Sequence, residues 1–284
     1  MDRPVSVSLV AIRCRIADRS VGTARGVEAL APLLGKRLGR EPRLIGTPGA
    51  PRIARYDEDL RRSRGCLLEA GGQVDDALAG GNFPLLVAGD CSIALTTLPT
   101  ALRYRPDARV LWLDAHGDFN TPETTSSGFL GGMALAGACG LWDAGVSGSI
   151  PAERVVLAGV RDLDPAERRL LERSEAAVIG ASSMETLVAA KNAVDGAPVY
   201  VHLDLDVLDP EDFPAEFPAP GGLAPDKLYD LLESVAEECD LVGLEVAAFH
   251  APDDDRERQE VATVALHVLE PLLDAIPEEA HVGG

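Results

Sequence analysis

The stretch VLWLDAHGD, residues 110–118, sets the expectations for both the fold and the site of this chain. It opens with a continuous apolar run, which is typical of a strand that helices cover on both faces of a parallel sheet. Asp114, His116 and Asp118 follow directly behind that run. Open α/β sheets bind ligands at the carboxyl ends of their strands. The stretch therefore predicts a buried strand that brings chemically active residues to one edge of a sheet.

Apolar runs alternate with longer helical patterns along the rest of the chain. We expect strands at Val5–Ile12, Phe83–Ala88, Val110–Asp114, Val155–Val160, Ala177–Ile179, Val199–Asp206 and Leu241–Val246. We expect helices at Arg25–Leu38, Asp57–Ala79, Ile93–Arg103, Pro165–Arg173, Met184–Asn192, Pro225–Glu238 and Arg256–Ala275. This alternation predicts a three-layer α/β/α fold with a central, mostly parallel sheet. We expect one domain over residues 1–284, with a loose tail over 277–284, because no linker interrupts the pattern.

The charge balance excludes two classes of partner. The 284 residues include 26 Lys and Arg against 46 Asp and Glu, which gives a formal net charge of −20. Nucleic acids and anionic membrane surfaces are bound through clustered basic residues, so neither is an expected partner. An acidic protein attracts a cationic small molecule, although a net charge of this size also serves solubility alone.

The five cysteines do not suggest a disulfide framework. They are odd in number, and no CxxC motif occurs. The sequence also lacks a signal-peptide pattern at Met1 and an apolar stretch of membrane-spanning length. We therefore expect a soluble, reduced, cytoplasmic protein, with Cys14, Cys66, Cys139 and Cys239 as small core or helix residues.

A second stretch, YVHLDLDVLDP at residues 200–210, repeats the pattern of acids behind an apolar run. Alternate side chains of an extended chain share a face, which would align the Asp and His residues of each stretch. Carboxylates clustered in this way are costly unless a cation neutralises them, and their oxygen and nitrogen donors suit Mn²⁺. Solvated loop caps are the alternative, but two such stretches favour a metal site. His202 would either support that site or be a core histidine.

These two stretches and AGDCS, residues 88–92, resemble the signature motifs of the arginase (ureohydrolase) family. The resemblance spans about Leu85 to Glu245 and implies an eight-stranded parallel sheet. It implies two Mn²⁺ ions and a bridging hydroxide that attacks a guanidino carbon. One ion would be bound by Cys91, Asp114, Asp118 and Asp204, and the other by Asp114, His116, Asp204 and Asp206. Asp118 would also help to protonate the leaving amine.

The resemblance further implies a cationic α-amino acid as substrate. Glu245 resembles the family glutamate that pairs with the guanidinium group. The segment 118–128 resembles the loop that binds the α-carboxylate, which assigns that role to Asn120 and Ser127. The segment 160–167 resembles the block that binds the α-amino group, through Asp164 and Glu167. Asp164 also fits a helix N-cap before a proline, and the two roles are compatible.

Two positions depart from the family pattern. Cys91 stands where the family has a metal-binding His, so that ion would be held less well, Zn²⁺ or Fe²⁺ would compete, or Cys91 would be a buried thiol. Gly131 stands where arginases have a proton-shuttling His, and Phe129 where they have Asn. His250 could replace that shuttle, or be a solvated loop residue.

These departures resemble the branch of the family that hydrolyses Nω-hydroxy-L-arginine to supply hydroxyurea for antibiotic (D-cycloserine) biosynthesis. We therefore predict a binuclear-metal amidinohydrolase that acts on Nω-hydroxy-L-arginine or L-arginine and releases ornithine with hydroxyurea or urea. Another ureohydrolase, of the agmatinase, guanidinobutyrase or formiminoglutamase type, is the alternative. So is a catalytically impaired binding relative. The resemblance also implies a homo-oligomer, a trimer or a hexamer.

Overall fold

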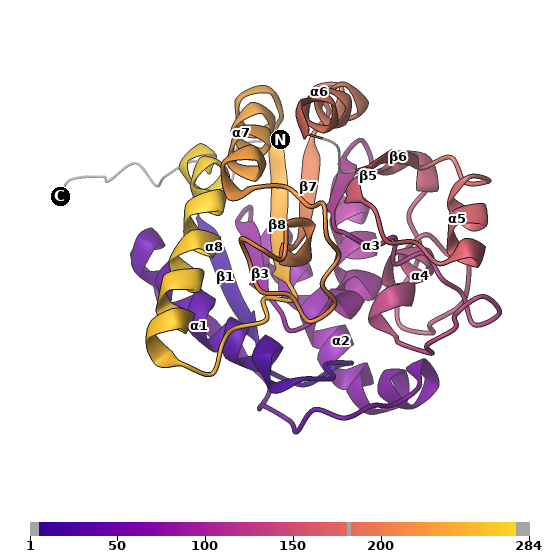
Figure 1. Cartoon of the computed structure of the whole chain (residues 1–284), viewed down its shortest axis with the longest axis horizontal. Helices are drawn as coiled ribbons and strands as arrows, with labels where there is room; N and C mark the ends of the chain where they lie inside the picture. The colour runs from indigo at the N-terminus through magenta and orange to yellow at the C-terminus, as the bar shows by residue number, and fades with distance from the viewer. Residues whose placement is uncertain (1–5, 181–182, 277–284) are drawn as a thin grey trace.

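The computed structural model describes residues 6–180 and 183–276. Eight strands form one sheet within these ranges, and every neighbouring pair is parallel, in the order β2-β1-β3-β8-β7-β4-β5-β6 (Figure 1). The strands are β1 (Val7–Ile12), β2 (Arg43–Ile45), β3 (Phe83–Val87), β4 (Arg109–Leu113), β5 (Val155–Val160), β6 (Ala177–Gly180), β7 (Val199–Asp204) and β8 (Leu241–Ala247). The predicted α/β fold with an eight-stranded parallel sheet is confirmed. The tail expected over 277–284 lies outside the described residues.

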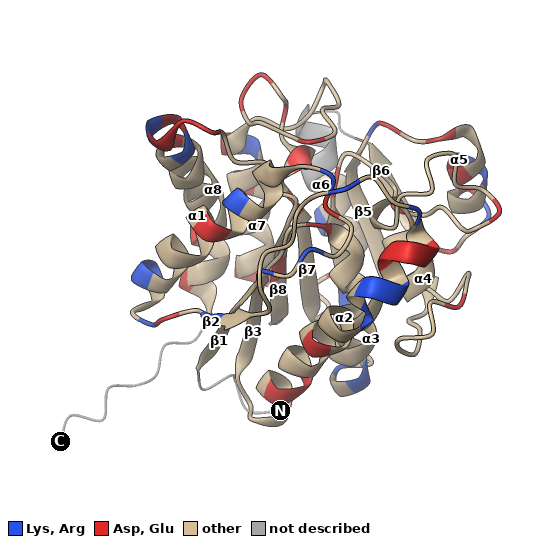
Figure 2. Ribbon diagram, turned by 90° about the horizontal axis from the view of Figure 1, so that it is seen from below, with Lys and Arg blue, Asp and Glu red and all other residues tan. Residues whose placement is uncertain are grey.

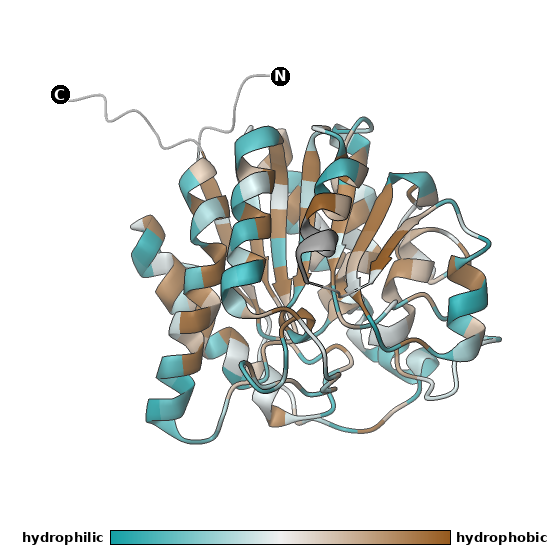
Figure 3. Ribbon diagram, turned by 45° about the horizontal axis from the view of Figure 1, so that its top comes forward, coloured by the Kyte–Doolittle hydropathy of each residue, from teal (hydrophilic) through white to brown (hydrophobic). Residues whose placement is uncertain are grey.

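Helices cover both faces of this sheet. They are α1 (Val21–Leu38), α2 (Tyr56–Ala79), α3 (Ala94–Tyr104), α4 (Ala134–Ala138), α5 (Pro165–Leu171), α6 (Ser183–Val194), α7 (Pro225–Glu238) and α8 (Asp255–Ala275). One apolar core joins α1, α6, α7 and α8 to the sheet, and a second core joins α2, α3 and α4 to the other face. Figure 3 shows the apolar strands between these layers, while Figure 2 shows most charged residues on helices and loops.

Local signals fix where several helices begin. The hydroxyl of Ser20 caps α1, so this helix begins at Val21, four residues before the predicted start. The carboxylate of Asp254 accepts from two backbone N–H groups at the start of α8. Prolines open α5 and α7, where their fixed φ suits a first helical turn and no N–H is needed.

The sequence prediction misses one strand and misplaces the ends of two others. The edge strand β2 is absent from the sequence prediction because it has only three residues, which are largely exposed and form no apolar run. The strand β4 ends at Leu113, before the acids. The strand β7 ends at Asp204, where a 3-10 turn over Leu205–Val207 begins. The acids of both motifs therefore lie at or beyond the strand ends.

The expectation of a protein without disulfides is also wrong. Cys14, which follows β1, is bonded to Cys66 on α2, with their Cα atoms 6.5 Å apart. The two cysteines are separated by 52 residues, and sequence spacing alone does not reveal such a pair. Of the helices in the described ranges, none combines the length and apolarity needed to cross a membrane.

Candidate metal and substrate site

A cavity of about 410 Å³ opens at the carboxyl ends of the strands. It lies at the junction of β7 and β4, where the strand order reverses, since the chain runs from β7 to β8 on one side and from β4 to β5 on the other. This is the usual place of ligand sites in open α/β sheets. The lining residues are Arg19, Gly89, Asp90, Cys91, His116, Asp118, Asn120, Ser127, Phe129, Gly131, Gly132, Asp162, Asp164, Glu167, Asp204, Asp206, Glu216, Phe217, Pro218 and Ala248.

The residues after β4 turn back on themselves and gather their polar groups. The Asp114 carboxylate accepts from the backbone N–H of His116 at 2.6 Å. Two residues further on, the backbone of Asp118 has a φ of 47°, which lies in the left-handed region and not in the extended one. The prediction that an extended chain aligns these side chains is therefore wrong in its geometry. A tight turn brings them together instead.

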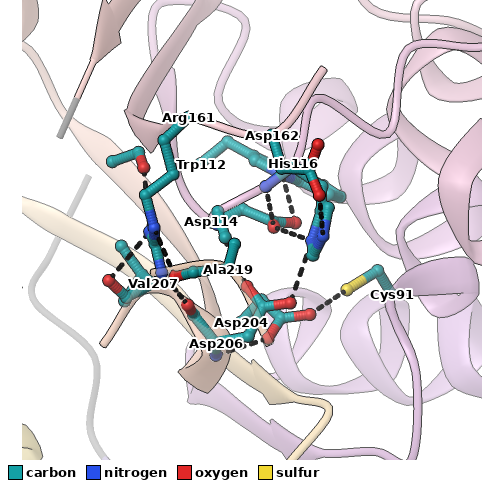
Figure 4. Close-up of polar contacts among 12 residues, drawn as sticks. Cys91, Trp112, Asp114, His116, Arg161, Asp162, Asp204, Asp206, Val207 and Ala219 are labelled. Carbon is teal, nitrogen blue, oxygen red and sulfur yellow. Dashed lines mark hydrogen bonds and ion pairs between the residues drawn. The ribbon is translucent and has the colours of Figure 1, made fainter. Parts of the chain in front are cut away.

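The acids from β7 meet this turn across the sheet. The Nδ1 atom of His116 lies 2.9 Å from Oδ2 of Asp206, and Asp206 accepts from the Ala115 N–H at 3.0 Å. The backbone N–H of Asp206 in turn donates to Asp204 at 2.8 Å. Figure 4 shows these side chains pointing toward one another.

Cys91 completes the group from the β3 side. It opens a 3-10 turn just after that strand, and its thiol donates to Oδ2 of Asp204 at 3.1 Å (Figure 4). The side chain is buried and free of any disulfide. The structure thus gathers the predicted metal-binding residues around one point, namely Cys91, Asp114, His116, Asp118, Asp204 and Asp206.

The electrostatics of the cluster reflect buried carboxylates that are crowded together. Burial raises the pKa of Asp114 to about 6, and the charge of Asp206 adds to the rise. Burial and the neighbouring acids also raise the pKa of Asp118 and of Asp204 well above the usual carboxyl range. Like charges this close favour uptake of a proton or a cation.

His116 and Cys91 respond in opposite ways to the same surroundings. Burial alone would lower the pKa of His116, but its contacts with Asp114 and Asp206 outweigh burial and raise that pKa to about 12. Burial raises the pKa of the Cys91 thiol, and the charge of Asp204 raises it further. The cluster is therefore strongly attractive to a divalent cation, which would replace these protons.

The donor set fits such a cation. One oxygen of Asp114, one oxygen of Asp206 and a ring nitrogen of His116 lie within 4.8 Å of one another. Carboxylate oxygens and imidazole suit Mn²⁺ and related divalent ions, and a thiolate adds a softer ligand on one side. The chemistry of these residues is therefore that of a metal-dependent hydrolytic site.

Arg161 was not singled out from the sequence, yet it holds one wall of the site. Its guanidinium group donates to five backbone carbonyls, two of them those of Asp206 and Ala219, at 2.7 and 2.8 Å (Figure 4). The carbonyls belong to β5 and to the segment between β7 and α7. Arg161 thereby fixes the backbone that carries Asp206. Only its place directly after β5 could have drawn attention to it.

The residues predicted to bind the amino-acid end of a substrate lie together on another side of the cavity. Asp164 accepts from the Ser126 hydroxyl at 3.1 Å and from the Asn120 amide at 3.5 Å. Asp164 is also the N-cap residue of α5, so both roles weighed for it are compatible. Ser127 lines the same cavity. The hydroxyl, amide and carboxylate groups suit an α-carboxylate and an ammonium group.

Glu167 connects this side to the metal-binding turn. Its carboxylate accepts from the backbone N–H groups of Phe119 at 2.8 Å and of Asp164 at 3.2 Å. Burial nevertheless raises the pKa of Glu167 to about 7. Its carboxylate thus positions the two loops as well as lining the cavity.

Glu245 lies apart from the other residues predicted to bind the substrate. The side chain is fully buried within β8 and is absent from the cavity lining. Its carboxylate contacts Nδ1 of His202 at 2.6 Å and accepts from the Tyr200 hydroxyl at 3.0 Å. At the end of β8 it is Ala248, with a φ of 57°, that faces the cavity. Direct pairing of Glu245 with a substrate guanidinium stays a prediction.

Aromatic side chains form the remaining wall of the cavity. A Cβ atom on Gly131 would lie 2.6 Å from the ring of Phe129. The Arg19 guanidinium lies over that ring, 4.5 Å from its centroid, and the Phe217 ring packs beside it, with ring centroids 5.2 Å apart. His250 is not in the lining, because it packs on Gly22 with Nδ1 3.2 Å from the Ser20 hydroxyl.

Known proteins are similar to this chain in sequence and in architecture. The model of the arginase family matches residues 56–273. A Streptomyces lavendulae N(omega)-hydroxy-L-arginine amidinohydrolase is 37% identical over 269 residues, which cover 95% of this chain and 98% of that protein. An arginase of Bacillus caldovelox is 35% identical over 210 residues, covering 68% and 70%. The crystal structure of a Bacillus caldovelox arginase superposes with a TM-score of 0.77 at 28% identity, covering 95% of this chain and 98% of that one.

Proposed function

Because this chain belongs to the arginase family, it is a hydrolase of guanidino C–N bonds, and we propose that its preferred substrate is Nω-hydroxy-L-arginine. The similar Streptomyces lavendulae protein carries that activity in its name and spans nearly the whole chain. The products would be ornithine and hydroxyurea, since water adds to the guanidino carbon and the bond to the ornithine nitrogen breaks. The hydroxyurea would feed antibiotic biosynthesis.

Separate groups of residues in the cavity would bind the metal ions and the two ends of the substrate. Bound divalent ions supply Lewis acidity that activates water toward a guanidino carbon. Cys91, Asp114, His116, Asp118, Asp204 and Asp206 would hold two Mn²⁺ ions. Asn120 and Ser127 would bind the α-carboxylate, while Asp164 and Glu167 face the ammonium group. Holding both ends of the substrate orients its guanidino group for attack. Asp118 would pass a proton to the leaving amine.

The proposed preference for a hydroxylated guanidine rests on one observation, the cavity wall formed by Gly131 and Phe129. No imidazole stands there to shuttle a proton to the leaving group, and the Phe129 ring lies beside the glycine instead. An Nω-hydroxyguanidine is less basic than a guanidine, so its reaction depends less on such a shuttle. Arginine would be hydrolysed more slowly by the same site.

Parallel assays test this proposal. The purified protein, loaded with Mn²⁺, is incubated with Nω-hydroxy-L-arginine, L-arginine, agmatine, guanidinobutyrate and formiminoglutamate. We expect hydroxyurea release from the first substrate to exceed urea release from arginine. Equal rates with arginine would overturn the preference. Turnover of one of the last three compounds alone would identify another ureohydrolase, and no product at all would indicate an impaired binding relative.

We further propose one domain over residues 1–284, a cytoplasmic location and a homo-oligomer, trimer or hexamer. A single sheet containing all eight described strands supports the first proposal. The family resemblance alone supports the oligomer, which size-exclusion chromatography with light scattering tests. Disulfides such as Cys14–Cys66 are uncommon in the cytosol, so cell fractionation should be combined with thiol labelling of the native protein.

A further inference from the structure

Three buried side chains lie in a row beneath the metal-binding acids. Trp112 on β4 is paired in register with His202 on β7, and His202 with Glu245 on β8. All three are fully buried, and none lines the cavity. Each strand residue two positions further on faces the same way, which places Asp114 and Asp204 directly above this row. The row therefore forms the floor of the metal site.

The imidazole of His202 is held in one orientation. Its Nδ1 atom lies 2.6 Å from Oε1 of Glu245, and the second oxygen of Glu245 accepts from the Tyr200 hydroxyl. The Trp112 ring is stacked on the imidazole, with centroids 3.5 Å apart and planes 4° apart. A carboxylate oxygen only accepts, so Nδ1 carries a proton, and in the neutral imidazole Nε2 then presents a lone pair.

This lone pair has no protein partner. Among the described residues, Nε2 of His202 is buried and makes no hydrogen bond. Buried polar atoms are nearly always paired, and an exception needs an explanation such as an ion. A ring nitrogen of His202, the Cys91 sulfur and a carboxylate oxygen of Asp114 all lie within 4.8 Å of one another. With Nδ1 engaged by Glu245, Nε2 is the nitrogen that remains for binding.

We propose that His202 binds, through Nε2, the divalent ion that Cys91 and Asp114 also bind, and that Glu245 positions the imidazole for this role. The inference rests on the metal-dependent function proposed above. Metal-binding histidines commonly donate their other ring N–H to a carboxylate, which is the arrangement of His202 and Glu245. Glu245 thus acts on the ion through His202, and its distance from the cavity is explained.

The proposal has a consequence for the choice of metal. Sulfur, imidazole and carboxylate together form a softer donor set than the two carboxylates and the imidazole of Asp114, Asp206 and His116, because of the sulfur. Zn²⁺, Co²⁺ or Cd²⁺ should therefore bind more tightly on the Cys91 side than Mn²⁺ does. A buried imidazole in addition to the thiolate would also compensate for the His that the family has at position 91.

Nuclear magnetic resonance of the unmodified protein tests the bond directly. Protein labelled with ¹⁵N in histidine is loaded with ¹¹³Cd²⁺. The one-bond coupling between cadmium and nitrogen splits the resonance of each imidazole nitrogen that binds the ion. We expect two split imidazoles, those of His116 and His202. The variants His116→Asn and His202→Asn each remove one of them, whereas His267→Asn, on the exposed side of α8, leaves both. A single split imidazole in the unmodified protein would overturn the proposal and leave His202 as a buried histidine whose polar contact is with Glu245.

Metal affinity provides the second readout. In competition with a chelator, Glu245→Gln should lower the affinity for one of the two ions by about 10- to 100-fold. His202→Asn should lower it at least as much. His267→Asn should leave both affinities unchanged, and circular dichroism confirms that each variant is folded. Unchanged affinity in a folded His202→Asn variant contradicts the proposal. Two split imidazoles without release of hydroxyurea or urea would support His202 as a metal ligand and overturn the proposed function. Release of either product with a single split imidazole would support the function and overturn the role of His202.

Discussion

The Phe129 ring occupies the space in which a side chain at residue 131 would begin. A Cβ atom on Gly131 would lie 2.6 Å from Cε1 and 2.7 Å from Cζ of that ring. The two residues are therefore coupled, because a larger residue at 131 requires the Phe129 ring to move. Both face the cavity.

This coupling predicts that the two residues change specificity only together. Gly131→His alone should destabilise the protein, because of the contact with Phe129, without increasing urea release from arginine. Phe129→Asn combined with Gly131→His should raise the ratio of arginine to Nω-hydroxy-L-arginine turnover. Parallel kcat/KM measurements with both substrates check this. A single Gly131→His variant with the full change in ratio would contradict it.

Arg161 should matter although it lies outside the cavity lining. Arg161→Lys replaces a group that donates to five carbonyls with an ammonium that has three N–H donors. We expect metal affinity and kcat to fall about 10- to 100-fold, since the backbone carrying Asp206 loses its support. Arg168→Lys on the exposed side of α5 is the matched control. Metal content measured beside activity separates this effect from a change in substrate binding alone.

The disulfide should contribute measurably to stability. Cys14→Ser, Cys66→Ser and the double variant should each lower the free energy of unfolding by about 2–4 kcal/mol, and all three by the same amount. Cys239, a free cysteine at the end of α7, serves as the control when changed to Ser. Urea titrations with and without dithiothreitol measure the effect. A midpoint that does not move on reduction would show that the bond does not form in solution.

Removing divalent ions should lower the melting temperature. Ions that bind only the folded protein stabilise it, by about 2.7 kcal/mol for each site at a free concentration 100 times the dissociation constant. We expect EDTA to lower the melting temperature and added Mn²⁺ to restore it. Asp206→Asn removes a charge from the cluster and should reduce this difference. A thermal scan in which EDTA has no effect on the unmodified protein would argue against a bound ion.

Much of the fold was predictable because buried parallel strands leave a strong pattern. The run before Asp114 is apolar throughout, and burial on both sheet faces is the reason. The edge strand β2 has no such burial and left no comparable signal. The pairing of Cys14 with Cys66 depends on how α2 packs beside β1, which no local pattern records.

The site was predictable in its members more than in its geometry. Residue types and spacing identified the acids around His116, but the turn at Asp118 replaced the extended chain that we expected. Glu245 was assigned from its resemblance to a family glutamate, and three residues along the chain separate its buried side chain from Ala248, which follows β8 and lines the cavity. Register within a strand is set by packing across the sheet, and a single sequence does not reveal it.

The stacked pair of Trp112 and His202 gives the protein an optical reporter of its own. Trp112 also donates its indole N–H to Asp114 at 3.1 Å, so its ring contacts the floor and the wall of the metal site at once. Any ion that engages these neighbours changes the electric field around the indole, and therefore its fluorescence. The second tryptophan, Trp142, bonds to the Met133 carbonyl instead. Titrations read at the emission of Trp112 could thus follow loading of the site without a label or a substrate.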